Sequence, residues 1–288
     1  MTSARTSSAE RSKTCARSLP DVTVVGSVNL DLVAKVERLP RHGETITDAE
    51  FARVPGGKGA NQAVAAARLG ADVSFIGCVG EDDFAEQALL GLREAHVELN
   101  VSHGSQTGIA LILVDAGGEN QIVVVPGANA ELEPSRPGGN VVCQLEIPID
   151  VVAAAAESAE FFCLNAAPAK PVPAEVVERA DLVVVNRYEL EALPRLSRLV
   201  ALTLGAEGAV LLENGEEVAH ARPPPVKAVD GTAAGDAFTA CLVVSLLEER
   251  DREEALARAC AAGAIAASRA GAQPSLPTAA EVDEMLKA

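Results

Sequence analysis

The fold is best predicted from residues 56–79, Gly-Gly-Lys-Gly-Ala-Asn-Gln-Ala-Val-Ala-Ala-Ala-Arg-Leu-Gly-Ala-Asp-Val-Ser-Phe-Ile-Gly-Cys-Val. A glycine turn leads into an alanine-rich run that predicts a helix over residues 59–69, ended by Gly70. The β-branched and aromatic run at residues 73–79 then predicts a strand. Helical and extended runs alternate in this way along most of the chain, which indicates an α/β fold.

The other elements follow the same alternation. Strands are predicted at residues 22–26, 73–79, 141–145, 161–165, 182–186 and 199–204. Helices are predicted at residues 59–69, 83–95, 149–159, 236–249 and 252–270, and a last helix at Thr278, whose spacing from Glu281 is that of a capping box. Because several strands are apolar throughout, we expect one mostly parallel sheet covered on both faces.

Two stretches, residues 32–54 and 107–125, interrupt this alternation. Each predicts two strands joined by a polar turn, at Arg41-His42-Gly43 and at Gly117-Gly118 respectively. We expect the two hairpins to form a small lid sheet beside the main sheet. Residues 20–288 then make one domain, and residues 1–19, rich in Ser, Thr and Arg, a disordered extension, with a transit peptide as the alternative.

Composition excludes several classes of protein. The 288 residues hold 24 Lys and Arg against 41 Asp and Glu, a net charge of −17, which disfavours nucleic acid as a partner. No apolar run approaches the ~20 residues that cross a bilayer. The six cysteines form no C-x-x-C pair, so we expect buried reduced thiols and a cytoplasmic location. The four histidines show no metal or nucleophile arrangement, and we expect them at the surface or in turns.

A second glycine-rich segment, Asp230-Gly-Thr-Ala-Ala-Gly-Asp236, leads into a long apolar run. The unpaired N–H groups of Ala233, Ala234 and Gly235 at a helix start favour an anion such as a phosphoryl group. A carboxylate at Asp236 beside that anion site suits a general base acting on a hydroxyl. The alternative is that Asp236 is an ordinary N-cap.

The first glycine segment is not a nucleotide P-loop, because no Ser or Thr follows Lys58. Its backbone N–H groups, with the side chains of Lys58 and Asn61, suit a polyhydroxylated ligand instead. Asn29 and Asp31 are two residues apart and face one side if that segment is extended, although both residue types are also common in turns.

Taken in order, these segments resemble the signatures of the ribokinase-like (PfkB) carbohydrate kinases. The matching stretches are Val25-Gly-Ser-Val-Asn-Leu-Asp31, residues 56–67, Asn186-Arg-Tyr-Glu189, Thr203-Leu-Gly205, residues 230–236 and Gly271-Ala-Gln-Pro-Ser275. The resemblance runs from about Val22 to the end of the chain. It implies a three-layer sandwich with a mostly parallel central sheet and a small β lid.

The resemblance also implies an activity and a set of site residues. The activity is ATP-dependent phosphorylation of D-ribose at the 5-hydroxyl, with Asp236 as base and the amides of Ala233, Ala234 and Gly235 as anion hole. Positions matching Asn29, Asp31, Gly57, Lys58, Asn61, Glu146 and Asp236 hold the sugar. Positions matching Asn186, Thr203, Gly205 and Gly208 lie along ATP, and Glu189 arranges the water shell of Mg²⁺. Positions matching Asp230, Thr232, Ala266, Gly271 and Ser275 surround an activating K⁺. A homodimer formed through the lid is also implied.

The chain departs from the family pattern at two short connections. Residues 130–140 contain four glycine or proline residues, Pro134, Pro137, Gly138 and Gly139, and leave no room for a helix. Residues 187–198 are interrupted by Pro194. We expect two layer helices to be shortened or missing, with part of a sheet face exposed. Gly231 stands where the family more often has Thr, which loosens the cation loop. Two alternatives therefore stay open: a kinase for another sugar or a nucleoside, and a sugar- or nucleotide-binding protein with impaired catalysis.

Overall fold

The computed structural model describes residues 19–117, 120–194 and 198–287. Within them the main sheet has the strand order β13-β12-β11-β10-β9-β8-β1-β4-β5. The strands are β1 (Asp21–Val25), β4 (Asp72–Gly80), β5 (Glu98–Gly104), β8 (Asn140–Cys143), β9 (Phe161–Asn165), β10 (Leu182–Asn186), β11 (Leu199–Thr203), β12 (Ala209–Glu213) and β13 (Glu216–Ala221). Pairing is parallel from β5 to β11 and antiparallel from β11 to β13.

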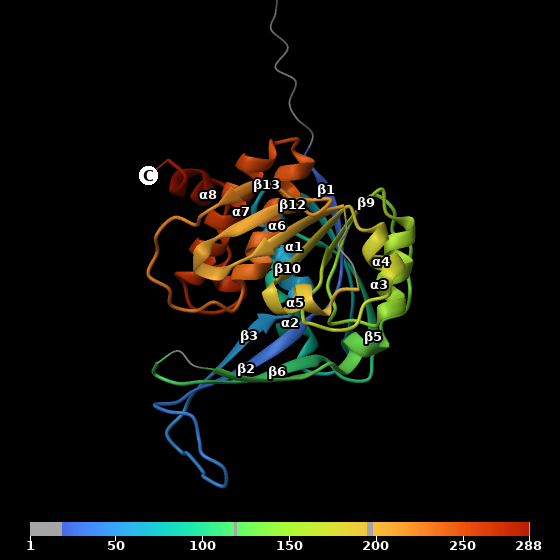
Figure 1. Ribbon diagram of the computed structural model, residues 1–288. Helices are drawn as coiled ribbons and strands as arrows, with labels where there is room; N and C mark the ends of the chain where they lie inside the picture. The colour runs from blue at the N-terminus through green and yellow to red at the C-terminus, as the bar shows by residue number, and fades with distance from the viewer. Residues whose placement is uncertain (1–18, 118–119, 195–197, 288) are drawn as a thin grey trace, which may run out of the picture.

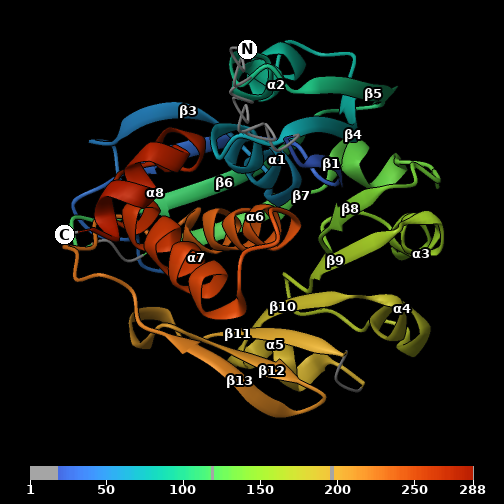
Figure 2. The ribbon, with the colours of Figure 1, turned by 90° about the horizontal axis from the view of Figure 1, so that it is seen from above.

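Helices cover both faces of this sheet (Figures 1 and 2). One layer contains α1 (Lys58–Arg68), α2 (Ala85–Glu94), α6 (Ala234–Leu247), α7 (Arg252–Ala267) and α8 (Ala279–Met285), and the other contains α3 (Ile149–Ser158) and α4 (Ala174–Arg179). Each layer encloses its own apolar core, one including Phe75 and Leu242 and the other including Phe162 and Val152. The predicted α/β class and mostly parallel sheet are confirmed.

Most of the predicted elements are present, with boundaries shifted by a few residues. The capping box that joins Thr278 and Glu281 at the start of α8 is also present. The prediction missed β5, α4 and the hairpin of β12 and β13. β5 and β13 lie at the sheet edges and are half exposed, so they lack the continuous apolar runs that revealed the inner strands.

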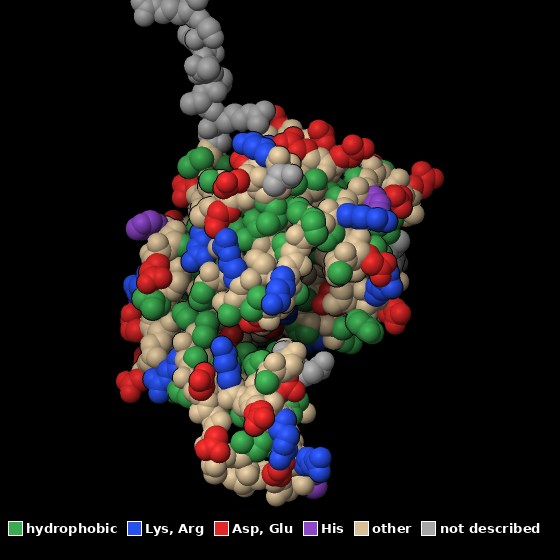
Figure 3. All heavy atoms as spheres, turned by 90° about the vertical axis from the view of Figure 1, so that its left-hand side faces the viewer, with side chains coloured by type: hydrophobic (Ala, Val, Ile, Leu, Met, Phe, Trp, Pro, Cys, Tyr) green, Lys and Arg blue, Asp and Glu red, His purple; other side chains and the backbone are tan. Residues whose placement is uncertain are grey.

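The lid is a separate four-stranded sheet below the body in Figure 1, with the order β3-β2-β6-β7. Its strands are β2 (Asn29–Lys35), β3 (Glu50–Gly56), β6 (Gly108–Val114) and β7 (Asn120–Val125). β2 and β6 pair in parallel, which joins the two expected hairpins into one sheet. The lid begins at Asn29, earlier than expected, and the predicted turn residue Gly118 lies outside the described residues. Figure 3 shows charges of both signs on the projecting tip.

The two short connections hold only short helical segments among the residues that the structure describes. The 3-10 helix η1 (Gly127–Glu131) is followed by residues 132–139 without a helix, and the connection after β10 holds the six-residue α5 (Arg187–Ala192) and then residues 195–197, which are not described. In the described part of the chain, no large apolar residue of β4 or β5 is exposed. Near the amino ends of these strands, Glu98 and Asn100 are exposed, and Ser74 Oγ donates to Glu98.

Across the residues that the structure describes, no helix is long and apolar enough to cross a membrane. The five described cysteines are buried and form no disulfide. His42, His96, His103 and His220 are exposed, as predicted. The expected extension at residues 1–19 lies, apart from Leu19, outside the described residues.

Candidate active site

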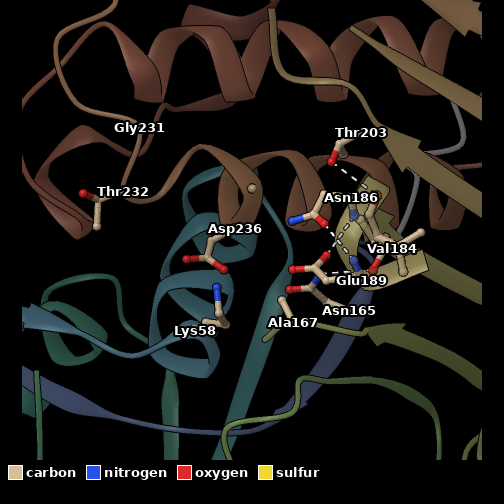
Figure 4. Close-up of a pocket in the computed structure, with 12 residues that line it drawn as sticks. Lys58, Asn165, Ala167, Val184, Asn186, Glu189, Thr203, Gly231, Thr232 and Asp236 are labelled. Carbon is tan, nitrogen blue, oxygen red and sulfur yellow. Dashed lines mark hydrogen bonds between the residues drawn. The ribbon is translucent and has the colours of Figure 1, made fainter. Parts of the chain in front are cut away.

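The candidate site lies where the carboxyl ends of β8, β9 and β10 meet the first turns of α1 and α6. A cavity of about 210 Å³ opens there (Figure 4). Its lining comes from α1, β9, β10, α5, β11 and the start of α6, namely Lys58, Asn165, Ala167, Val184, Val185, Asn186, Glu189, Thr203, Gly231, Thr232, Gly235 and Asp236. Ligands of open α/β sheets bind at this edge of the strands.

Asp236 lies in the first turn of α6 and is 3% exposed. Its carboxylate accepts hydrogen bonds from Asn61 Nδ2 at 3.0 Å and from Gln62 Nε2 at 2.9 Å. The N-cap of α6 is Ala233, so the N-cap alternative for Asp236 does not hold. Burial raises the pKa of Asp236, although Lys58 and the two amides oppose that rise.

The start of α6 has the properties of an anion site. Among the described residues, no side chain caps this helix. Gly235 is exposed and lines the cavity, and Ala234 donates its N–H to Gly231. The positive end of a 14-residue helix therefore faces the cavity beside Asp236.

The start of α1 differs from the start of α6, because its backbone N–H groups have partners within the protein. The N–H of Lys58 donates to Glu146 Oε2 at 3.1 Å, that of Gly59 to Ser27 Oγ at 3.3 Å, and that of Ala60 to Ser27 O at 2.8 Å. A carboxylate of the protein thus occupies the helix start that we expected to bind a ligand through its backbone. The side chains of Lys58 and Asn61 remain directed at the site.

Two lid residues approach the same region. Asn29 and Asp31 both lie on β2, so the strand reading of this segment is confirmed and their side chains share one face. Asn129 Nδ2 donates to Asn29 Oδ1 at 2.7 Å, which directs the Asn29 amide nitrogen away from Asn129. Asp31 packs against Gly56, where a Cβ would lie 2.3 Å from the carboxylate.

The site gathers more negative than positive charge. Burial, followed by the charges of Glu146 and Asp236, raises the pKa of Asp31 to about 7. Lys58 lies directly beside Asp236 in Figure 4. Burial alone would lower the pKa of Lys58, but Asp236, Glu146 and Glu189 outweigh it, so that its pKa is raised and the group stays an ammonium.

Asn186 and Glu189 face Lys58 and Asp236 across the cavity (Figure 4). They form a capping box on α5, in which Glu189 N–H donates to Asn186 Oδ1 at 2.9 Å and Asn186 N–H donates to Glu189 Oε2 at 2.8 Å. Thr203 also lines the cavity, with its hydroxyl donating to Val185 O. Gly205 and Gly208 lie in the turn after β11 and are not among the lining residues.

The predicted cation residues come from three segments that meet at Asp230. One oxygen of Asp230 accepts from the N–H of Thr232 at 3.0 Å and from its hydroxyl, and the other accepts from Gly271 N–H at 2.9 Å. Val229 and Asp230 donate their N–H groups to Ala267 O, next to Ala266 in the last turn of α7. Ser275 donates its hydroxyl to Ala272 O. Within the described residues, no group of three or more His, Cys, Asp or Glu could hold a metal ion.

Sequence reasoning missed several polar residues of the site, namely Ser27, Gln62, Asn129, Gln144 and Asn165, all of which are buried. Gln62 follows directly after the predicted Asn61, and buried polar residues in an alanine-rich helix are a signal that could have identified it. The others give no local signal, because their partners lie far away along the chain.

A buried carboxylate at the uncapped start of a long helix, with amide partners and a facing lysine, is the apparatus of an enzyme that transfers a phosphoryl group to a hydroxyl. The comparison with known proteins gives the family. The model of the pfkB family of carbohydrate kinases matches residues 19–279, and the chain belongs to this family.

Individual proteins to which the chain is similar are ribokinases. The chain is 37% identical to a ribokinase of Bacillus subtilis (strain 168), covering 92% of this chain and 99% of that protein. The crystal structure of a ribokinase from Thermotoga maritima has a TM-score of 0.84 and 33% identity, covering 94% of this chain and 100% of that one. An Arabidopsis thaliana ribokinase complexed with ribose and ATP has a TM-score of 0.83 and 31% identity, with the same coverage.

Proposed function

We propose that the protein is an ATP-dependent kinase that phosphorylates D-ribose at its 5-hydroxyl, giving ribose 5-phosphate and ADP. The observation that carries this proposal is the Asp236 carboxylate, which Asn61 and Gln62 hold beside the open start of α6. Similarity to ribokinases over nearly the whole chain, one of them solved with ribose and ATP, supports the choice of substrates.

The sugar site consists of the side chains of Asn29, Asp31, Lys58, Asn61 and Glu146 together with the backbone at Gly57. Asn61 Oδ1 is buried and has no hydrogen-bond partner among the described residues. A buried acceptor without a partner is costly, and a sugar hydroxyl would satisfy it. Carboxylates and amides at this density suit a ligand that presents hydroxyl groups on several sides.

In the transfer step, Asp236 takes the proton of the 5-hydroxyl and the freed oxygen attacks the γ-phosphorus of ATP. The bond from that phosphorus to the β,γ-bridging oxygen breaks, and ADP leaves. The anion hole of this proposal consists of the amides of Ala233, Ala234 and Gly235 at the start of α6, which would stabilise the negative charge on the transferring group. Gly235 lines the cavity, whereas the N–H of Ala234 donates to Gly231 O and would have to leave that carbonyl to serve the phosphoryl group. The Lys58 ammonium adds a positive charge on the opposite side of Asp236 (Figure 4).

ATP lies along Asn186, Thr203, Gly205 and Gly208, with its phosphates directed toward Gly235. Mg²⁺ bound with the nucleotide would supply charge neutralisation of the phosphates. Glu189 fits a role in ordering its water shell, because the carboxylate lines the cavity while one of its oxygens is fixed by the N–H of Asn186.

A potassium site beside the anion hole would use oxygens of Asp230, Thr232, Ala266, Gly271 and Ser275. The contacts of Asp230 with Thr232 and Gly271 support it, and oxygen ligands suit such a hard cation. No described atom lies within 4 Å of a Cβ built on Gly231, so space does not require glycine there. The conformational freedom of the Gly231 backbone loosens the loop that would bind the cation.

A homodimer through the lid is the quaternary part of the proposal. Leu111 of β6 and Val123 of β7 are directly paired across the two strands and are 45% and 60% exposed. β7 is an edge strand of the lid, and Ile122, Val124 and Val125 are exposed as well. An apolar edge of this kind favours contact with a second copy of the chain. The buried free cysteines support a reducing, cytoplasmic location.

The activity is tested by ADP release from ATP and Mg²⁺ with ribose, with and without K⁺. Ribose-dependent ADP release supports the proposal, and a rise with K⁺ supports the cation site. A panel containing deoxyribose, ketohexoses and nucleosides identifies a different substrate if ribose is the weaker one. Ribose binding in calorimetry without ADP release at high enzyme concentration would instead indicate a binding protein with impaired catalysis.

A further inference from the structure

A chain of buried amide side chains ends at Asp236. Gln144 Nε2 donates to Gln62 Oε1 at 2.7 Å, and Gln62 Nε2 donates both to Asp236 Oδ1 and to Asn165 Oδ1, at 2.9 Å each. Asn165 Nδ2 donates to Val184 O at 3.2 Å. Gln62 and Gln144 are at most 1% exposed. This series of hydrogen-bonded amides joins the carboxyl ends of β8, β9 and β10 to α1 and the start of α6.

The partners determine which way the amides of Asn165 and Gln62 point. A backbone carbonyl only accepts hydrogen bonds, so Asn165 must turn its nitrogen toward Val184 and its oxygen toward Gln62. Gln144 donates to the oxygen of Gln62, which leaves both N–H groups of Gln62 for Asn165 and Asp236. Gln62 is thereby held as a donor to Asp236.

We propose that Gln62, oriented by Gln144 and Asn165, is a positioning residue that holds the Asp236 carboxylate in its reactive orientation and in its ionised form. This inference rests on the proposed function, in which Asp236 is the base. An N–H donor favours the charged form of a carboxylate over the neutral acid. A fixed donor on Oδ1 and another from Asn61 on Oδ2 also restrict rotation of the carboxylate, leaving its remaining lone pairs for the hydroxyl.

Charged groups around Asp236 explain why a neutral donor is useful there. Lys58 from α1 is the positive group that acts on it, whereas Asp31 from β2, Glu146 after β8 and Glu189 from α5 are negative. The three carboxylates favour protonation of Asp236, which would remove the base. An amide donor counteracts them without adding a second ammonium group that would also bind the carboxylates of the sugar site.

The test is the pH dependence of kcat at saturating ribose and ATP for the full chain and for Gln62→Leu. We expect the acid limb of the profile to move to higher pH by about one unit, because a charge-assisted hydrogen bond is lost. At pH values on that limb, kcat should then fall about tenfold, while KM for ribose changes less than about threefold. An unchanged acid limb would overturn the proposal.

Gln144→Met provides the second test, needed if Gln62→Leu does not fold. This variant keeps Gln62 but removes the hydrogen bond from Gln144 to Gln62 Oε1, one of the contacts that orient the Gln62 amide. We therefore expect a smaller shift of the acid limb in the same direction, and no shift would count against the role of Gln144. Asn140→Leu is the control, since it removes a side-chain amide donor at the opposite end of β8, where Asn140 Nδ2 donates to the backbone carbonyl of Asp21 instead of to Gln62. Asp236→Ala separates the two proposals. If that variant keeps near-normal turnover, the base assignment fails; if it is inactive and the Gln62→Leu profile is unchanged, only the positioning role fails.

Discussion

At the scale of single residues, the site is a balance between crowded carboxylates and a small number of donors. Asp31, Glu146 and Asp236 influence one another electrostatically, and Lys58 is the cation among them. Such crowding disfavours the folded state but creates a region rich in acceptors for hydroxyl groups. Two predictions separate the chemical role of these carboxylates from their effect on stability.

Asp236→Ala should lower kcat by roughly 10²- to 10⁴-fold, the usual contribution of a general base, while ribose affinity changes little. The reason is that the variant removes the group that accepts the hydroxyl proton but leaves the other sugar contacts in place. Steady-state ADP release gives kcat, and calorimetry gives the dissociation constant for ribose. Near-normal turnover would exclude Asp236 as the base.

Asp31→Asn should stabilise the protein at pH 8 while weakening ribose binding. The folded-state pKa of about 7 is above the ordinary value, so the folded protein binds this proton more tightly than the unfolded chain, and stability falls as pH rises from about 4 to 7. Removing the charge should recover on the order of 2 to 4 kcal/mol at pH 8, and much less at pH 4. Urea unfolding at both pH values measures this, with the exposed Asp72→Asn as control. Equal stability of Asp31→Asn and the parent at pH 8 would contradict it.

At the scale of elements, the start of α1 connects the lid to the body. Gly57 has φ +89°, and a Cβ there would lie 2.8 Å from the backbone nitrogen of Asn29, the first residue of lid strand β2. The same turn directs the N–H of Lys58 at Glu146. The glycine is therefore needed both for its backbone conformation and for the close approach of two elements.

Gly57→Ala should raise KM for ribose at least about tenfold and destabilise the fold more than strain alone would, because backbone atoms must move apart. Gly70→Ala is the matched control: Gly70 has φ +96°, but no described atom lies within 4 Å of its Cβ position. We expect the control to cost only about 1 to 2 kcal/mol and to leave KM unchanged. Equal effects of the two variants, measured by ribose kinetics and urea unfolding, would rule out the close approach as the cause.

Prediction from sequence succeeded for elements with a strong local pattern and failed where the pattern was weak. The inner strands and the helix over residues 59–69 show continuous apolar or alanine-rich runs, and the structure has them. The site residues drawn from the family resemblance include seven that line the cavity, Asp236 and Lys58 among them. The partners of Asp236 on α1 were not predicted as such, because Asn61 and Gln62 lie 175 and 174 residues from it in the chain.

At the scale of the whole molecule, residues of the candidate site from α1, β10, α5 and α6 line one cavity although two connections are short. Among the described residues, β4 and β5 expose no large apolar side chain. Leu111 and the apolar residues of β7 form a group of neighbouring exposed side chains on the lid. We therefore expect contact with another molecule at the lid and not at β4 and β5.

Val123→Glu should convert the proposed dimer into a monomer, since a buried unpaired carboxylate is costly at an apolar contact. Sedimentation velocity over a dilution series measures the oligomeric state. The control is Val218→Glu, an exposed valine on β13 at the far edge of the main sheet, which should leave the state unchanged. A parent protein that is monomeric at all concentrations would refute the lid dimer.

The sequence by itself determined the α/β layering, the presence of a lid and the identity of the family, because each depends on local periodicity or on motifs in a fixed order. Tertiary structure alone decided how the two glycine-rich helix starts differ. Glu146 and Ser27 occupy the N–H groups at the start of α1, whereas the start of α6 stays open to the cavity beside Asp236. The physical reason is that a helix start binds whatever partner packing brings within hydrogen-bond distance, and that partner comes from remote parts of the chain.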